Sequence, residues 1–152
     1  MDELRIGSEG DTTQYIIIHI DNEDYGINIA NVDNIVRMTH ITRVPQVAPY
    51  LKGVINLRGI VVPVMSLRLK MGLKEDEITK KTRIIILKLE QHGTIGIIVD
   101  EVREVITLEG DQTEKVSADT SSEHANFVQC VGKYAGGLIS ILDLNAVAME
   151  KE

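Results

Sequence analysis

Short runs of β-branched and aliphatic residues, separated by turn-forming residues, recur along most of the chain. The clearest pair, residues 54–57 and 60–64, flanks the dipeptide Arg58-Gly59. β-Branched side chains favour extended backbone, and Gly59 can take the positive φ that a tight turn requires. The pattern predicts a β-hairpin. Pro63 is expected at an edge or a bulge, because proline has no N–H to donate to a neighbouring strand.

The same pattern predicts three more hairpins, formed by residues 15–20 with 25–29, 83–89 with 94–99, and 127–134 with 138–142. Asp, Asn and Gly, which favour turns, are common in the connecting residues. Two of the four hairpins are followed by a predicted helical turn. Ser66 and Asp143 can cap these turns at their N-termini, and Gly72 can end the first of them.

Two segments instead have apolar residues at helical spacing. Ile29, Val32, Ile35 and Val36 would lie on one face of a helix, with Asp33 and its polar neighbours on the other. This spacing predicts a short amphipathic helix. Residues 100–106 again have an apolar residue at every third or fourth position, and a second short amphipathic segment is predicted there.

The order of these elements suggests an internal repeat. A shift of 70 residues places Gly26 and the residues after it on Gly96 and its neighbours, and a shift of 77 residues places Ser66-Leu67 on Asp143-Leu144. Each half would contain a hairpin, an amphipathic segment, a second hairpin and a helical turn. Identities are few, so chance similarity between two β-rich segments is the alternative. A true repeat predicts two small β lobes of about five strands that pack on one another.

Length and composition narrow the class of protein. A chain of 152 residues with 43% hydrophobic residues can form one domain with its own core. The net charge of −7 argues against nucleic-acid binding. The single cysteine, Cys130, indicates a reducing compartment. No secretory signal or apolar run long enough to span a membrane is found, so a cytoplasmic protein without direct membrane insertion is expected.

Some segments are predicted to lie outside the hairpins. Residues 1–13 are polar and acidic and are expected to form a flexible tail, which leaves residues 14–149 as a single domain. Residues 41–44 are predicted to be extended, and Pro45 and Pro49 mark the loop that follows. The segment 109–125, rich in Asp, Thr, Ser and Glu, is predicted to be mostly an exposed loop.

Motifs for catalysis, metals and phosphates are missing from the sequence. The four histidines are scattered and no second cysteine can complete a zinc site. Residues 21–26 resemble the start of a calcium loop, but Val32 stands where a bidentate Glu is required. The chain is therefore predicted to be no enzyme and to use no metal or cofactor. A surface for protein partners remains: the guanidinium of Arg58, on a tight turn, could bind a carboxylate bidentately, or it could be a solvated turn arginine.

Residues 53–64, Gly-Val-Ile-Asn-Leu-Arg-Gly-Ile-Val-Val-Pro-Val, resemble the CheW family of bacterial chemotaxis adaptors. Three further stretches fit the pattern of that family: Tyr25-Gly26-Ile27 with Val32 and Ile35, residues 96–102, and residues 138–144. Ser66 departs from it, since the family often has Asp there. The resemblance implies a mainly β fold of two SH3-like five-stranded β-barrels that are intertwined and share a core, with short helices.

The resemblance also implies a function. A CheW-like protein is expected to be a non-catalytic adaptor that couples the cytoplasmic tips of methyl-accepting chemoreceptors to the histidine kinase CheA, at receptor arrays on the inner face of the membrane. It is expected to be a monomer when free. The positions that match receptor-binding or kinase-binding positions of the family are Val32, Ile35, Gly53, Asn56, Leu57, Arg58 and Gly59. From the residues alone, a small-ligand-binding or sensory β-barrel domain is the alternative.

Overall fold

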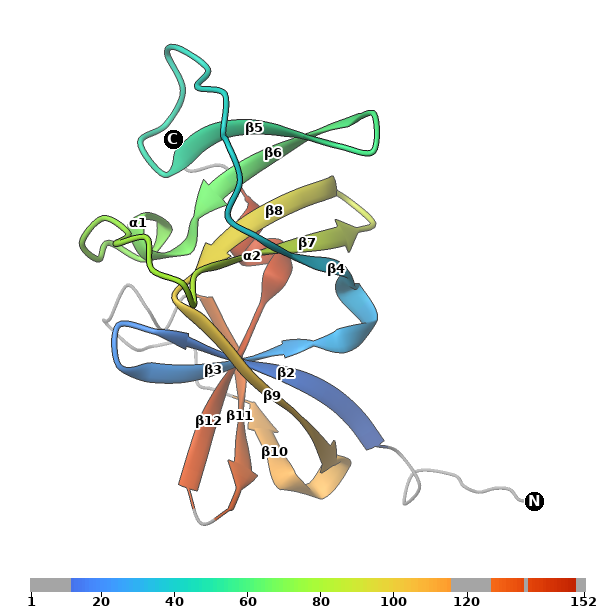
Figure 1. Ribbon diagram of the computed structural model, residues 1–152. Coiled ribbons are helices and arrows are strands. Elements are labelled where there is room, and N and C mark those ends of the chain that lie inside the picture. The colour runs from blue at the N-terminus through green and yellow to red at the C-terminus, as the bar shows by residue number, and fades with distance from the viewer. Residues whose placement is uncertain (1–11, 116–126, 136, 150–152) are drawn as a thin grey trace.

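The computed structural model describes residues 12–115, 127–135 and 137–149, and this part of the chain forms two β-sheets with few short helices (Figure 1). A six-stranded sheet, here the first lobe, has the order β10-β11-β12-β3-β2-β9. Its strands are β2 (Thr12–Ile20), β3 (Glu23–Asn28), β9 (Glu101–Glu109), β10 (Thr113–Lys115), β11 (Val128–Tyr134) and β12 (Gly137–Leu142).

A five-stranded sheet, here the second lobe, has the order β4-β7-β8-β6-β5. Its strands are β4 (Val32–Arg37), β5 (Leu51–Leu57), β6 (Ile60–Ser66), β7 (Arg83–Leu89) and β8 (Gly93–Val99). The short helices are η2 (Ile29–Asn31), α1 (Leu67–Lys70), η3 (Gly110–Gln112) and α2 (Leu144–Ala148). The four predicted hairpins are all confirmed. Among the described residues, no helix is long and apolar enough to cross a membrane.

The two lobes exchange strands. β4 follows β3 of the first lobe but pairs with β7 of the second, and β9 follows β8 of the second lobe but pairs with β2 of the first. In Figure 1, both connections run between the upper and lower sheets. Parallel pairing follows the predicted repeat: Ile141 lies opposite Gly26, and Val64 opposite Gly96. These pairs are related by the shifts of 77 and 70 residues, so the repeat is confirmed and the lobes are intertwined.

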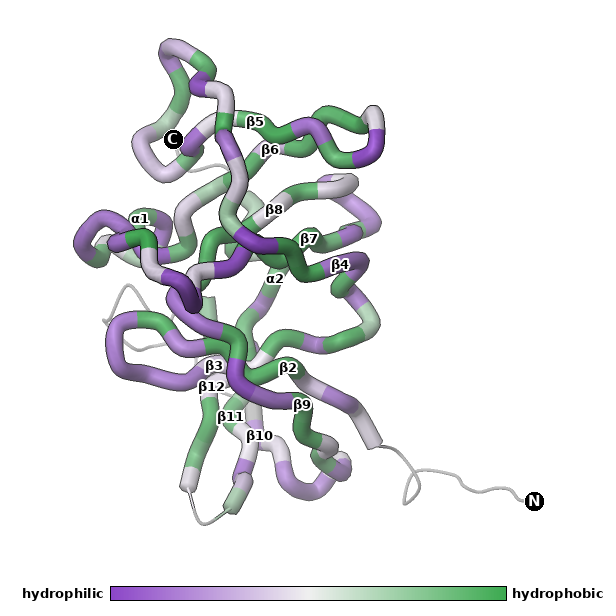
Figure 2. The backbone as a smooth tube through the Cα atoms, viewed as in Figure 1, coloured by the Kyte–Doolittle hydropathy of each residue, from purple (hydrophilic) through white to green (hydrophobic). Residues whose placement is uncertain are grey.

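Strands buried on both faces explain the runs of consecutive isoleucines. On β2, Ile16 and Ile18 pack in a core that both lobes share, whereas Ile17 packs in a core inside the first lobe. On β7, Ile85 enters the shared core and Ile84 a core inside the second lobe. Figure 2 shows hydrophobic residues along the strands of both sheets. The shared core fixes how the two lobes sit on one another.

The predicted amphipathic helices are wrong. Residues 29–31 form a single 3-10 turn, and both Val32–Arg37 and Glu101–Glu109 are strands. A β-bulge lies in each strand, because Asp33 and Arg103 are skipped in the pairing of β4 with β7 and of β9 with β2. A bulge adds one residue to the two-residue period of a strand. Val32 and Ile35, three residues apart, therefore pack against the same shared core, and their spacing imitates a helix.

Both predicted helix N-caps are confirmed, whereas Pro63 has a different position from the predicted one. The Ser66 side chain accepts a hydrogen bond from the Leu69 N–H at 3.1 Å, and Asp143 accepts one from the Ala146 N–H at 3.2 Å, so both N-caps are present. Pro63 lies opposite Val54, whose N–H and C=O both bond Thr42 at 2.8 Å. The predicted edge or bulge at Pro63 is wrong, since β6 lies between β8 and β5 and the bulge of this pair is at residues 51–53 of β5. Proline is tolerated because the Val54–Pro63 pair makes no ladder hydrogen bond between β5 and β6.

Two boundaries differ from the prediction. β2 begins at Thr12, so Thr12 and Thr13, which the composition assigns to the tail, are part of a strand; residues 1–11 lie outside the described residues. The predicted loop over 109–125 is wrong at its start, where η3 and β10 form. A capping box explains η3, since the Gln112 side chain accepts a hydrogen bond from the Glu109 N–H at 2.7 Å. Residues 116–126 lie outside the described residues.

Candidate partner-binding surface

The turn between β5 and β6 holds four of the predicted site residues together. Arg58 and Gly59 both have positive φ, 53° and 85°, the geometry of a type I′ turn. The Asn56 side chain accepts a hydrogen bond from the Gly59 N–H at 2.9 Å, which fixes the turn. Leu57 is half-buried and packs against the core inside the second lobe. Arg58 is thus presented at the tip of a rigid hairpin, with 69% of its side chain exposed.

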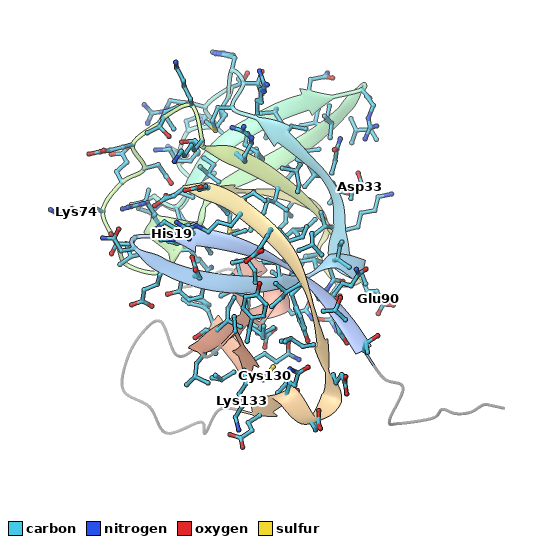
Figure 3. The ribbon with its side chains drawn as sticks, turned by 60° about the horizontal axis from the view of Figure 1, so that its bottom comes forward. His19, Asp33, Lys74, Glu90, Cys130 and Lys133 are labelled. Carbon is cyan, nitrogen blue, oxygen red and sulfur yellow. The ribbon has the colours of Figure 1, made fainter. Side chains whose placement is uncertain are left out.

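Arg58 connects the two edges of the five-stranded sheet. β4 and β5 are at opposite ends of the strand order, yet Nη2 of Arg58 lies 3.7 Å from Oδ2 of Asp33, the bulged residue of β4. Nζ of Lys88 on β7 lies 3.6 Å from the other oxygen of Asp33. Figure 3 shows Asp33 on β4, at the side of the molecule away from His19 and Lys74. The contact is too long for a strong hydrogen bond, so guanidinium N–H groups stay available to a partner.

Val32 and Ile35 lie on β4, the strand that carries Asp33, the partner of Arg58. Both are partly buried and pack against the shared core. The turn and this part of β4 are therefore brought together by the Arg58–Asp33 pair.

Gly53 has a different environment from the other predicted site residues. It is buried in β5, and its φ is 143°. A Cβ atom at this position would lie 2.1 Å from the carbonyl oxygen of Thr42. Glycine is therefore required for the segment around Thr42 to pair with β5. Gly53 fixes the backbone that carries the hairpin and presents no side chain of its own.

Ile60 and Val61, the first residues of β6, are two further exposed residues beside the turn that the sequence analysis missed. They come directly after Gly59 and are 61% and 64% exposed. Neighbouring residues of a strand point to opposite faces, so Ile60 and Val61 expose apolar surface on both faces of the hairpin beside Arg58. No pattern in the sequence marks them as exposed, since runs of consecutive β-branched residues such as 84–86 are buried on both faces elsewhere in this fold.

A partly buried polar network on the other side of the molecule was also missed by the sequence analysis. Nε and Nη2 of Arg68, at the start of α1, donate to the carboxylate of Asp100 at 3.0 and 3.1 Å. The guanidinium further donates to the Lys74 carbonyl at 3.1 Å and to Asp21 at 3.4 Å. Asp21 lies in the β2–β3 turn of the first lobe, and Asp100 in the crossing from β8 to β9. The network therefore connects the two lobes.

The pKa values of Arg68 and of the nearby Asp76 are both raised. Hydrogen bonding to Asp100 raises the pKa of Arg68. Burial raises the pKa of Asp76, whose carboxylate accepts a hydrogen bond from the Ser66 hydroxyl at 2.5 Å. The Ser66 hydroxyl therefore both caps α1 and binds Asp76. In the described residues, no group of three or more His, Cys, Asp or Glu side chains could hold a metal ion.

Comparisons with known proteins agree on one family. A family model described as the CheW-like domain matches residues 14–152. Chemotaxis protein CheW of Bacillus subtilis is 38% identical over 90% of this chain and 86% of its own length. Chemotaxis protein CheW of Helicobacter pylori is 35% identical over 88% of this chain and 80% of its own length. The crystal structure of the scaffolding protein TtCheW from Thermoanaerobacter tengcongensis is similar, with a TM-score of 0.80 at 29% identity over 88% of this chain and 90% of that one. The chain therefore belongs to the CheW family.

Proposed function

We propose that this protein is a non-catalytic chemotaxis adaptor that couples the cytoplasmic tips of chemoreceptors to the histidine kinase CheA and so controls kinase activity. The observation that carries the proposal is the rigid β5–β6 turn, which presents an exposed guanidinium beside an exposed apolar pair. Membership of the CheW family supports it. The protein acts in the cytoplasm, at receptor arrays on the inner face of the membrane.

Two groups of residues serve this function in our proposal. Asn56, Leu57, Arg58 and Gly59 form one contact surface. Val32 and Ile35 contribute a second contact on β4, and Gly53 acts by holding the hairpin in place. An interface around one hairpin is small, so we expect each to bury roughly 600 to 800 Å² per partner and to be weak alone. Many copies in an array make such weak contacts effective through multivalency.

Family membership does not favour the alternative of a small-ligand-binding β-barrel. A ligand-binding barrel of this size would need its interior for the ligand. Here the interior of the second lobe is filled by buried side chains, namely Ile55, Val62, Val64, Ile84, Ile86 and Ile98. The surface, rather than the interior, is where this fold meets its partners.

Replacing Arg58 by glutamate is expected to weaken binding of one of the two partners about tenfold or more, with little change in folding. The side chain is 69% exposed and its contact with Asp33 is 3.7 Å long, and such surface pairs contribute about 0.2–1 kcal/mol to stability. A reversed charge in the centre of an interface costs more. Pull-down with CheA and with a receptor cytoplasmic fragment measures binding, and urea denaturation measures stability.

Lys81→Glu is the matched control, since it makes the same change of charge at an exposed loop residue. It should leave both partners bound. If Arg58→Glu unfolds the protein where Lys81→Glu does not, Arg58 is structural and its binding role is wrong. The role is equally wrong if a folded Arg58→Glu variant holds both partners as wild type does.

A further inference from the structure

The segment between β4 and β5 is basic in an otherwise acidic protein. Residues 38–50, which connect the two strands, contain Arg43 and one histidine but no aspartate or glutamate, and Lys52 follows in β5, whereas the whole chain has a net charge of −7. Locally clustered charge of one sign attracts groups of the opposite sign, even when the net charge of the protein is unfavourable. Arg43 and Lys52 can therefore attract an acidic group to this part of the surface.

This segment forms one wall of a groove with a volume of about 590 Å³. The other walls are Leu51 and Lys52 of β5 and the side chain of Glu75. Val44 and Val47 are exposed on the loop, at 39% and 38%. The groove thus combines apolar surface with cationic groups, which suits a peptide better than a small polar ion.

Hydrogen bonds hold the groove in shape. Thr42 and Val54 exchange two main-chain hydrogen bonds of 2.8 Å. The Leu51 N–H donates to the Ala48 carbonyl at 2.9 Å, and the Ser66 N–H donates to the Tyr50 carbonyl at 2.7 Å. A preorganised site loses less conformational entropy when a ligand binds. The groove is therefore already built before a partner arrives.

Glu75 shows what kind of group the groove stabilises. Nζ of Lys52 donates to its carboxylate at 2.9 Å. The pKa of Glu75 is lowered, first by this hydrogen bond and further by the charges of Lys52 and Arg43. Glu75 lies in an acidic stretch, Glu75-Asp76-Glu77-Ile78, which has neither helix nor strand structure. Because 70% of the Glu75 side chain is exposed, a competing carboxylate could displace it at little cost.

We propose that this groove binds an extended acidic segment of a partner protein, one of whose carboxylates replaces Glu75 on Lys52 while an apolar residue contacts Val44 and Val47. Glu75 is then an internal competitor that weakens binding. None of residues 56–59 of the Arg58 turn lines the groove. The proposal therefore does not depend on which partner the turn binds.

The test is fluorescence polarisation with a labelled octapeptide of alternating glutamate and valine, beside the same peptide with lysine in place of glutamate. Wild type should bind the acidic peptide and not the basic one, more weakly as salt is added. Lys52→Gln should weaken binding about fivefold, because one exposed ion pair contributes roughly up to 1 kcal/mol. Glu75→Gln should tighten it about threefold, since the internal competitor is gone.

Lys133→Gln, which removes an exposed charge from the first lobe, is the control and should bind as wild type does. All three variants change exposed or half-exposed side chains, and circular dichroism will show whether each is folded. The proposal is overturned if wild type binds neither peptide, or binds both equally. It is also overturned if Glu75→Gln binds the acidic peptide no more tightly than wild type, or if Lys52→Gln binds it as well as wild type.

Discussion

Replacing Gly53 by alanine is expected to destabilise the protein by about 3–5 kcal/mol, enough to prevent folding if the wild type is only marginally stable. The added Cβ would lie 2.1 Å from the Thr42 carbonyl oxygen and 2.9 Å from a methyl group of Ile41. The segment of Ile41 and Thr42 would have to move away from β5, and this movement would break the Thr42–Val54 hydrogen bonds. The φ of 143° adds backbone strain for any residue with a side chain. Urea denaturation measures the loss.

Gly93→Ala separates the two contributions. Gly93 also has a positive φ, 71°, but apart from the glycine and its two chain neighbours no heavy atom lies within 4 Å of its Cβ position. The variant should lose only about 1 kcal/mol, the usual cost of placing alanine in a glycine conformation. Equal losses in the two variants would show that the close approach at Thr42 does not decide the path of β5.

Replacing Arg68 by alanine is expected to cost about 2–4 kcal/mol. The side chain is only 16% exposed, and it neutralises Asp100, itself 25% exposed. Without the guanidinium, the partly buried carboxylates of Asp100 and Asp76 are left without their nearby cation, and removal of one partner from a buried ion pair is strongly destabilising. Thermal and urea unfolding of Arg68→Ala measure the loss.

A double-mutant cycle with Asp100→Asn tests the cause. The Arg68→Ala loss should shrink by 1 kcal/mol or more when the partner charge has already been removed. Arg58→Ala serves as the comparison, because this arginine is exposed and should change stability by less than about 0.5 kcal/mol. Additive effects of Arg68→Ala and Asp100→Asn would contradict the proposed role of the ion pair between the lobes.

Structural elements that depend on residues close together in the sequence could be predicted. Hairpins follow from β-branched runs around a turn, and the caps of α1 and α2 follow from Ser66 and Asp143 just before them. The repeat could be found because corresponding strands of the two halves bury the same faces and therefore have similar apolar patterns. Bulges could not be recognised, since the extra residues Asp33 and Arg103 shift the apolar spacing from two to three. A bulged strand then has the same pattern as a short helix.

For the candidate site, too, contacts between residues close in sequence could be predicted and contacts between distant residues could not. Asn56, Leu57, Arg58 and Gly59 are consecutive, so their meeting on one turn was predictable. Asp33 was not, because it reaches Arg58 only when the curved sheet brings its opposite edges together. The Arg68 network joins residues 21, 68 and 100, which meet only after the lobes have exchanged strands. Contacts of this kind depend on the whole topology.

The central claim is that this protein bridges two others, and the most direct measurement is a three-component pull-down. A receptor cytoplasmic fragment is immobilised, and CheA is applied with and without this protein. We predict that the kinase is retained well above background only when this protein is present. We also predict that Arg58→Glu abolishes the gain while Lys81→Glu keeps it. Kinase retention that is the same with and without the protein would contradict the adaptor function.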